Sequence, residues 1–261
     1  MKKFLLSTVI LCLAGIVCAA EYSSYQEAVK AGEAALKAKN YEAMHSAFVQ
    51  AKKFANSDFT KWNATFFEVK ALREMKKFDD SIKQLDEYLA GENPENLKAA
   101  MNFVKGLVLN SKNEKAQGTE LIEKALSCNE LFQYMKDQSY SILMNYYYSN
   151  RNFEKCAECA KKAIADQKSL KEVHDTARFY YVQSLFDQQN FDECEKYLKE
   201  YTPLAQSNGN KARMAYIYGC LLKNSEEFEE ATKQFELAIK YEPNGWRSIN
   251  AKKFIKAMQD K

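Results

Sequence analysis

Glycine and proline are scarce in this sequence of 261 residues, which contains only 8 Gly and 3 Pro. A sandwich, a barrel or a doubly wound sheet of this size needs many tight turns, and these two residues commonly form them. Aromatic residues make up 13% of the chain, which is too much core-forming surface for a disordered, collagen-like or low-complexity protein. The composition therefore predicts a mostly helical protein.

Long apolar runs are also rare, and the first one lies at the N-terminus. Two lysines precede an uncharged, mostly apolar stretch over residues 4–17, and small side chains follow it. This order is typical of a secretory signal peptide over residues 1–20, cleaved after about Ala20, and its short, lysine-led form resembles bacterial signals. The stretch is shorter than the roughly 20 residues of a membrane span. A lipoprotein signal fits less well, because Val17 rather than a small residue precedes Cys18. We expect an exported protein, periplasmic or secreted, with no transmembrane segment in the mature chain.

An excess of one charge is lacking once that segment is removed. The full chain has 38 Lys and Arg against 35 Asp and Glu, a net charge of +3. Loss of Lys2 and Lys3 leaves 36 basic residues and a net charge of +1. The sequence has no basic tail or stripe either, and nucleic-acid binding depends on the neutralisation of phosphates. We therefore expect no nucleic-acid partner.

What the sequence does contain is an internal repeat. Short polar turns followed by an aromatic residue, which we call the anchor, recur with a period of 37 or 38 residues. One gap of 75 residues corresponds to two periods and predicts a further anchor position at Lys115. A fixed period of this length is typical of solenoid proteins. The aromatic anchors are Tyr41, Phe78, Phe153, Phe191 and Phe228.

Other positions repeat in register with the anchors. Apolar residues follow seven and ten residues after them, and offsets of three, seven and ten lie on one face of a helix. Each unit is therefore expected to form a helical hairpin that cannot bury its apolar face alone, with close helix contact at two sets of mostly small residues. Nine residues before the anchors stand Gly32, Val69, Gly106, Met144, Val182 and Gly219, and three after them stand Met44, Ser81, Gly118, Cys156, Cys194 and Ala231.

These features resemble the tetratricopeptide repeat (TPR) family, although the early Trp of the family is absent and the period is slightly long. The best match is the last unit, with Tyr218-Gly219, Leu222, Phe228, Ala231, Phe235, Ala238-Ile239 and Pro243. The resemblance implies an all-α, right-handed α-solenoid of about six helix-turn-helix units. Over residues 21–243 these units are expected at about 22–57, 58–94, 95–131, 132–169, 170–207 and 208–243. A capping helix is expected over residues 244–261, with Trp246, Ile249, Phe254, Ile255 and Met258 as its apolar set.

Few residues suit catalysis or metal binding. His45 and His174 are the only histidines, and each lies among polar residues of an expected helix. The sequence has no Ser-His-Asp order, glycine-rich phosphate loop or HExxH spacing. Its acidic residues alternate with lysines at helical spacing, as on a solvated face. We therefore expect no enzyme, no cofactor and no metal site.

Cysteine is the remaining reactive residue. Five of the 7 cysteines lie after the signal peptide, and Cys156 and Cys159 form a CxxC motif. The motif falls inside an expected repeat helix, whereas redox motifs lie at a helix N-terminus, and Ala160 replaces the histidine of a haem-attachment motif. Cys156 and Cys194 occupy a small packing position, so we interpret them as small apolar core residues. A disulfide between Cys156 and Cys159 is the alternative, and thiol redox chemistry is a remote one.

The TPR resemblance also implies a partner-binding surface, because the first helix of each unit lines the concave groove in such arrays. We call the residues about twelve, eight and five before each anchor the groove stripe. They combine aromatic side chains with amides and cations, as peptide-recognition surfaces do, or else part of them packs between hairpins. The family's carboxylate clamp needs a Lys where this sequence has Ser141, so we expect no full clamp. The predicted groove residues are Phe66, Lys70, Arg73, Phe103, Leu107, Asn145, Tyr148, Phe179, Gln183, Phe186, Tyr216 and Lys223.

Two functions of different classes follow from these features. The first is an exported scaffold that binds a peptide or protein partner in the groove without catalysis. The alternative is a structural or oligomerising component of the cell envelope that uses convex or terminal surfaces. The sequence specifies neither the partner nor the oligomeric state.

Overall fold

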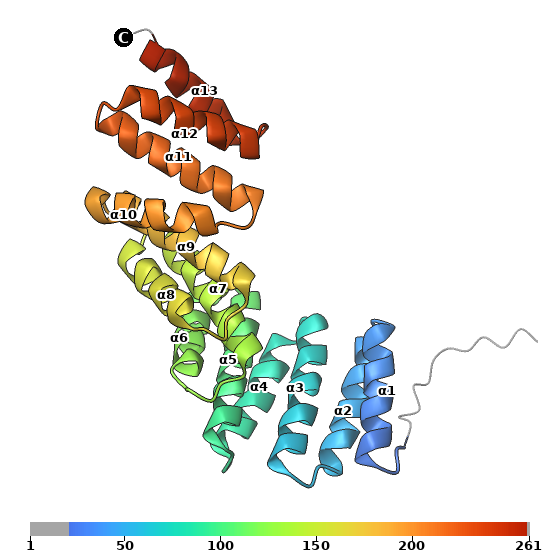
Figure 1. The fold of residues 1–261 in the computed structure, drawn as a ribbon. Coiled ribbons are helices and arrows are strands. Elements are labelled where there is room, and N and C mark those ends of the chain that lie inside the picture. Colours follow the sequence, from blue (N-terminus) through green and yellow to red (C-terminus); the bar gives the residue numbers. More distant parts are fainter. Residues whose placement is uncertain (1–20, 260–261) are drawn as a thin grey trace, which may run out of the picture. The chain divides into compact units, whose positions relative to one another are not determined.

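The computed structural model describes residues 21–259, so the expected signal peptide lies outside the described part of the chain. Within these residues the chain forms thirteen α-helices, one short 3-10 helix and no strand (Figure 1). The all-α prediction is confirmed. No helix in this range combines the length and the apolar character that a membrane crossing needs.

The helices form six helix-turn-helix pairs followed by a terminal helix. Each second helix begins at a predicted anchor position, and Lys115, the position inferred from the double gap, is one of them. The first helices are α1 (Tyr25–Lys37), α3 (Asp58–Glu74), α5 (Glu95–Ser111), α7 (Gln133–Ser149), α9 (Lys171–Asp187) and α11 (Asn208–Asn224). The second helices are α2 (Tyr41–Lys53), α4 (Phe78–Ala90), α6 (Lys115–Leu126), α8 (Phe153–Ala165), α10 (Phe191–Tyr201) and α12 (Phe228–Tyr241). The 3-10 helix η1 (Thr202–Leu204) follows α10, and α13 (Trp246–Gln259) is the terminal helix.

The turn inside each hairpin has one backbone geometry, repeated six times. The residue two before the anchor has a positive φ, between 55° and 72°. In the fourth hairpin the Asn152 N–H donates to the Tyr147 carbonyl and the Arg151 N–H donates to the Tyr148 carbonyl. This pattern is the Schellman motif, which ends helices and commonly uses glycine at the left-handed position. Here that position holds Lys39, Lys76, Asn113, Arg151, Gln189 and Glu226, so the low glycine content does not mean few tight turns.

The chain divides into two compact units, and the division falls within α4. The described part of the first unit, residues 21–84, contains α1, α2, α3 and the start of α4. In its core the Phe67 ring stacks on the Phe48 ring with the centroids 4.8 Å apart. The second unit begins at Leu85 and contains the remaining helices through α13. The buried core of the first unit includes Ala28, Met44, Phe48, Ala51, Ala64 and Ala71.

The two helices of a hairpin meet at the small positions identified in the sequence. In the third hairpin, a Cβ added to Gly106 would lie 2.6 Å from the Gly118 carbonyl oxygen and 2.7 Å from Cγ1 of Ile122. In the fourth hairpin the Cys156 thiol lies 3.4 Å from the Met144 carbonyl oxygen. Any larger side chain at these positions would separate the helices, which confirms the predicted close contact.

Facing side chains within a hairpin are also matched in size. Gly32 faces the ring of Phe48, and Gly219 faces the ring of Phe235, which lies 2.7 Å from where a Cβ would stand. The same two positions of the fourth hairpin hold Met144 and Ala160, and both are fully buried. A large residue on one helix is thus paired with a small one on the other, as dense packing requires.

Buried aspartates connect successive hairpins of the second unit. Asp175 in α9 is 3% exposed and accepts hydrogen bonds from the Gln206 N–H (3.0 Å), the Ser207 N–H (3.3 Å) and the Asn210 side-chain amide (2.8 Å) at the start of α11. Asp137, one period earlier, accepts a bond from the Leu170 N–H (3.3 Å) just before α9. Each aspartate therefore binds the N-terminal end of the next first helix.

The terminal helix covers the end of the core with only part of its apolar set. Phe254, Ile255 and Met258 pack against the cluster formed by Leu222, Ala231, Phe235 and Ala251. Trp246 and Ile249, predicted to belong to the same apolar face, are instead 57% and 54% exposed. They lie in the first turn of α13 and are only partly covered, so the cap presents two large apolar side chains to solvent.

Candidate functional site

The predicted groove residues separate into buried and accessible ones. Phe103 and Phe179 are 2% and 5% exposed, so they pack in the interior and cannot serve as contacts for a partner. For these two residues the packing alternative holds. The others are accessible to different degrees: Phe66, Lys70 and Arg73 in the first unit, and Leu107, Asn145, Tyr148, Gln183, Phe186, Tyr216 and Lys223 in the second.

In the first unit the groove residues mainly contact neighbours on their own helix. Phe66 stacks on Trp62 with the ring centroids 5.5 Å apart. The Lys70 ammonium lies 5.8 Å from the centre of the Phe67 ring, and Arg73 pairs with Glu74 at 3.1 Å. The aromatic residues thus form a row along α3 that Lys70 contacts, while Arg73 is held by Glu74.

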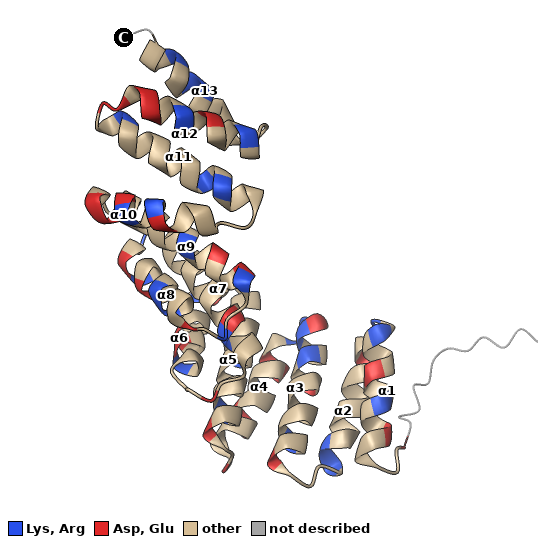
Figure 2. Cartoon of the chain, viewed as in Figure 1, with Lys and Arg blue, Asp and Glu red and all other residues tan. Residues whose placement is uncertain are grey.

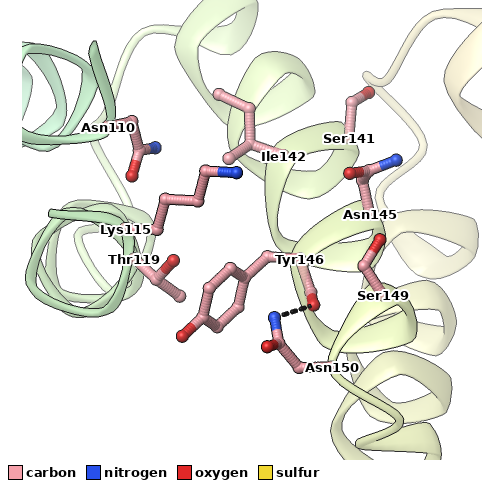
Figure 3. A pocket seen from close by; sticks show the side chains of 9 residues that line it. All are labelled: Asn110, Lys115, Thr119, Ser141, Ile142, Asn145, Tyr146, Ser149 and Asn150. Atoms are coloured by element: carbon pink, nitrogen blue, oxygen red, sulfur yellow. Dashed lines mark hydrogen bonds between the residues drawn. The ribbon is translucent and has the colours of Figure 1, made fainter. Parts of the chain in front are cut away.

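The second unit contains a recess of about 480 Å³ between the end of α5, the start of α6, and α7 (Figure 3). Asn145, a predicted groove residue, lines it together with Asn110 and Ser141, which occupy other positions of the groove stripe. The recess is therefore built on the stripe, at the third and fourth hairpins. The remaining lining residues are Lys115, Thr119, Ile142, Tyr146, Ser149 and Asn150.

The recess has a mostly apolar wall with several polar side chains, and two oxygen atoms of its lining residues lack partners. Thr119 is only 4% exposed, and its Oγ1 has no hydrogen-bond partner in the structure. The Oδ1 of Asn110, which leans against Gly118, is buried without a partner as well. Buried polar atoms are rarely left unpaired, because each lost hydrogen bond costs free energy. Both oxygens are covered by neighbouring groups, so a donor could reach them only if side chains of the lining shift.

Lys115 adds a positive charge to the recess. Its amine points toward the space beside Ile142 (Figure 3), and no carboxylate of the described residues lies within 4.0 Å of it. Lys115 takes the place of the aromatic anchor found in the other five hairpins. That departure from the repeat pattern was the one signal in the sequence that could have marked this residue.

Hydrogen bonds connect the groove residues of α7 to α9. The Tyr148 hydroxyl donates to Asp187 at 2.8 Å, and the Gln183 side-chain amide donates to the same carboxylate at 3.0 Å. The Asn145 amide lies 3.3 Å from the Tyr180 hydroxyl. Burial raises the pKa of Tyr148, and its bond to Asp187 raises it further. This part of the stripe is therefore fixed in one arrangement, with Asn145 exposed beside the recess.

The CxxC cysteines are separate thiols buried between helices. All five cysteines of the described chain are free. The Cys156 sulfur faces the Met144 carbonyl and the Cys159 sulfur faces the Tyr140 carbonyl, at 3.4 and 3.9 Å. Burial raises the pKa of Cys156 to about 11 and that of Cys159 to about 12. Cys156 and Cys159 do not form the alternative disulfide in this structure. Their thiols are neutral, and neutral thiols are poor nucleophiles.

The histidines lie away from the recess. His174 contacts the Asp166 carbonyl oxygen at 2.9 Å, and His45 lies 4.0 Å from Glu68 in the first unit. Over residues 21–259 no three His, Cys, Asp or Glu side chains come together as a metal site would require.

Comparisons with known proteins agree on the fold. No family model matches the chain, and no curated protein matches it. The crystal structure of YrrB, described as a TPR protein with an unusual peptide-binding site, is 17% identical, with a TM-score of 0.58 over 80% of this chain and 99% of that one. The structure of pilF from Pseudomonas aeruginosa is 13% identical, with a TM-score of 0.55 over 90% of this chain and 96% of that one. The chain thus has a TPR-like α-solenoid fold.

Proposed function

We propose that the protein is an exported, non-catalytic scaffold that binds an extended segment of a peptide or protein partner. The segment lies along the first helices of the second unit and enters the recess between α5, α6 and α7. The observation that carries this proposal is the recess itself, a space of about 480 Å³ with a mostly apolar wall, several polar side chains and two buried oxygens that lack partners. The TPR-like fold supports it, because YrrB, a protein of similar fold, is described as having a peptide-binding site.

The chemistry of the recess suits the backbone of a polypeptide. Side-chain amides such as those of Asn110 and Asn145 can each accept and donate, as a peptide group does. A partner N–H bonded to Oγ1 of Thr119 would gain about 0.5–1.5 kcal/mol and remove an unpaired buried atom. Lys115 can bind a partner carbonyl or carboxylate at the edge of the recess. Catalysis has no comparable support, since the histidines and the buried thiols lie outside this lining.

Selection of short peptides from a random displayed library against the purified protein tests this function. The selected peptides are expected to bind with a Kd near the micromolar range, and Asn145→Ala should weaken them about tenfold. Thr119→Val should also weaken binding but leave the free energy of unfolding unchanged or higher, since the lost hydroxyl has no partner in the free protein.

Asn129→Ala is the matched control for these variants, because Asn129 is exposed and lies outside the recess. Equal affinity of all four proteins, or failure to select any peptide, would contradict a binding role for the recess.

Export is a separate part of the proposal and rests on residues 1–20. The full chain, expressed in a bacterium, is expected in the periplasm or medium with Glu21 as its first residue. N-terminal sequencing of the purified protein measures this. A cytoplasmic product that keeps Met1 to Ala20 would exclude export.

A second function is favoured by one observation, the exposure of Trp246 and Ile249 on the terminal helix. Large exposed apolar residues at the end of an array can join copies of a chain into an oligomer or an envelope structure. Sedimentation of the wild type and of Ile249→Lys separates the two functions. A wild-type oligomer that the Ile249→Lys substitution dissociates into monomers would support the structural role. A monomer for both proteins would support the scaffold.

A further inference from the structure

We propose that the second unit holds a carboxylate-binding site formed by Arg213 and Arg247, which takes an acidic group of the bound polypeptide. This inference rests on the proposed function and specifies the chemistry of the partner. The site lies on α11 and α13, apart from the recess at α5, α6 and α7.

The first observation is the charge of these two helices. α11 carries Lys211, Arg213 and Lys223 and no acidic residue, and α13 from Trp246 to Gln259 likewise carries only basic charged residues. Figure 2 shows both helices with blue segments and no red ones, whereas α12 carries both colours. α11 and α13 contact each other on a chain that is nearly neutral overall. Lys211 lies over the Tyr241 ring of α12 and Arg213 over the Phe179 ring of α9, so only part of this charge, Arg213 on α11 and Arg247 on α13, belongs to the site.

The second observation is the position of Arg213. It stands three residues before Tyr216, one turn earlier along the groove stripe of α11. Its guanidinium carbon lies 4.8 Å from the centre of the buried Phe179 ring. Among residues 21–259 its one hydrogen bond is long, with Nη1 donating to Oδ1 of Asn210 at 3.5 Å. A guanidinium stacked on a ring keeps its N–H edge free to bind a carboxylate in a bidentate manner.

The third observation is that Arg247 stands beside α11, since the Trp246 ring that it covers lies 5.5 Å from the Tyr216 ring. Its guanidinium carbon is 4.5 Å from the centre of the Trp246 ring. Burial lowers the pKa of Arg247, and the nearby charge of Arg213 lowers it further. Glu242 raises it, yet neither arginine has a carboxylate of the described residues within 4.0 Å. Two partly buried cations that repel each other are stabilised when an anion binds between them.

Aromatic side chains form the wall of this site. Trp246 is 57% exposed, and its ring meets that of Tyr216 edge to face with centroids 5.5 Å apart. Trp, Tyr and Arg are the residues that dominate binding energy at interfaces. The two arginines and the aromatic wall together fit a peptide in which an acidic residue stands next to an aromatic or large apolar residue.

Calorimetric titration with three defined peptides tests the site. The acidic probe is acetyl-Gly-Phe-Asp-Asp-Gly-amide, and the neutral one has Asn in place of both Asp. A third probe is the neutral peptide with a free C-terminal carboxylate, which separates a terminal carboxylate from side-chain carboxylates. One or both carboxylate probes are expected to bind at least about tenfold more tightly than the neutral amide, with a difference that shrinks as salt is added.

The decisive variant is Arg213→Gln/Arg247→Gln, which should reduce the affinity for the acidic probe to that for the neutral one. Arg151→Gln is the control, since it removes one arginine charge at a turn where the next hairpin already has Gln189. The single variant Arg247→Gln, in the first turn of α13, removes the same number of charges as this control and gives the same test if the double variant unfolds. Equal binding of acidic and neutral probes, no binding of any carboxylate probe, or an equal loss in Arg151→Gln would overturn the site.

The outcome for this site is distinguishable from that for the recess. Selected peptides that depend on Asn145 but not on either arginine would leave the proposed function intact and remove the carboxylate site. A failure to bind any peptide, selected or defined, would contradict both.

Discussion

Glycine at residue 106 has a role that no other residue type can fill. Its α-carbon lies where α5 meets α6, so an added methyl group would overlap the Gly118 carbonyl oxygen at 2.6 Å. That atom belongs to the backbone and cannot rotate away as a side chain would. The overlap can be relieved only if the two helices separate.

Gly106→Ala is therefore expected to lower the free energy of unfolding by about 1–3 kcal/mol. Gly209→Ala provides the control, since nothing lies within 4 Å of a Cβ at that position in the first turn of α11. It should be neutral or stabilise by up to about 1 kcal/mol, because alanine has a lower conformational entropy in the unfolded chain. Urea titration of both variants measures the difference, and equal effects would contradict the contact.

The thiols are expected to differ in reactivity by position. Burial raises the pKa of Cys156 and Cys220 to about 11 and that of Cys159 and Cys194 to about 12. At mildly alkaline pH these four are neutral, while Cys128 is partly exposed in the connection after α6. Alkylation followed by peptide mapping should find Cys128 modified first in the native protein and all five after unfolding. Labelling of Cys159 as fast as Cys128 would contradict this order.

At the scale of the element, the left-handed turns are built without glycine. Gln189 has a φ of 60°, a conformation that costs an L-residue about 1–2 kcal/mol. Gln189→Gly is therefore expected to raise the free energy of unfolding by about 0.5–1 kcal/mol, the entropy of glycine offsetting part of the gain.

Its neighbour supplies the control for this prediction. Gln188 has a φ of −81° and its side chain donates to the Ser184 carbonyl, so Gln188→Gly should destabilise. Thermal unfolding of the two variants is expected to shift in opposite directions. A shift in the same direction would show that the left-handed backbone carries no strain.

Asp175 is the second element-scale feature, because it links α9 to the start of α11. Asp175→Ala would remove the acceptor of the Gln206 and Ser207 N–H groups and would leave the buried Asn210 amide without it. We expect a loss of about 2–4 kcal/mol. Asp192→Ala, exposed in the first turn of α10, should cost less than about 1 kcal/mol. Chemical denaturation measures both, and similar losses would contradict the link.

The helices could be predicted from the sequence because their spacing is set by a local rule repeated six times. Lys115 shows how reliable this repeat is. The period alone predicted the start of α6, which lacks the aromatic residue that begins the other second helices. The site was only partly predictable. Asn145 followed from the register, but Thr119 belongs to the second helix of its hairpin, and Phe179 turned inward although its register matches that of accessible residues. The repeat register predicts the face of the helix on which a residue lies. The burial of that residue depends on which neighbouring elements pack against that face.

At the scale of the whole molecule, ionisable groups buried in the neutral form make the fold sensitive to alkali. Burial raises the pKa of Tyr140, Tyr201 and Tyr216 to about 12, and four cysteines are raised as well. Between the unfolded values, near 9 for Cys and 10 for Tyr, and these folded values, the folded chain binds more protons than the unfolded chain. By linkage its free energy of unfolding must fall as pH rises through this window.

The expected result is a progressive loss of stability above about pH 9, with tyrosinate absorbance rising as the chain unfolds. Urea unfolding at a series of alkaline pH values measures it. All of these groups lie in the second unit, so the loss is expected there. Constant stability up to about pH 11 would show that the tyrosines ionise in place.

The matched sizes inside the hairpins have a consequence for how such a chain can change during evolution. A first helix is fitted to its own second helix: Gly219 accepts Phe235, and Met144 stands opposite Ala160. Exchange of single helices between hairpins would set Met144 against a phenylalanine or leave a hole beside Ala160. We therefore expect crossovers to be tolerated in the connections between hairpins and not at the left-handed turns within them. The hairpin is thus the smallest segment that this protein can duplicate, delete or acquire intact.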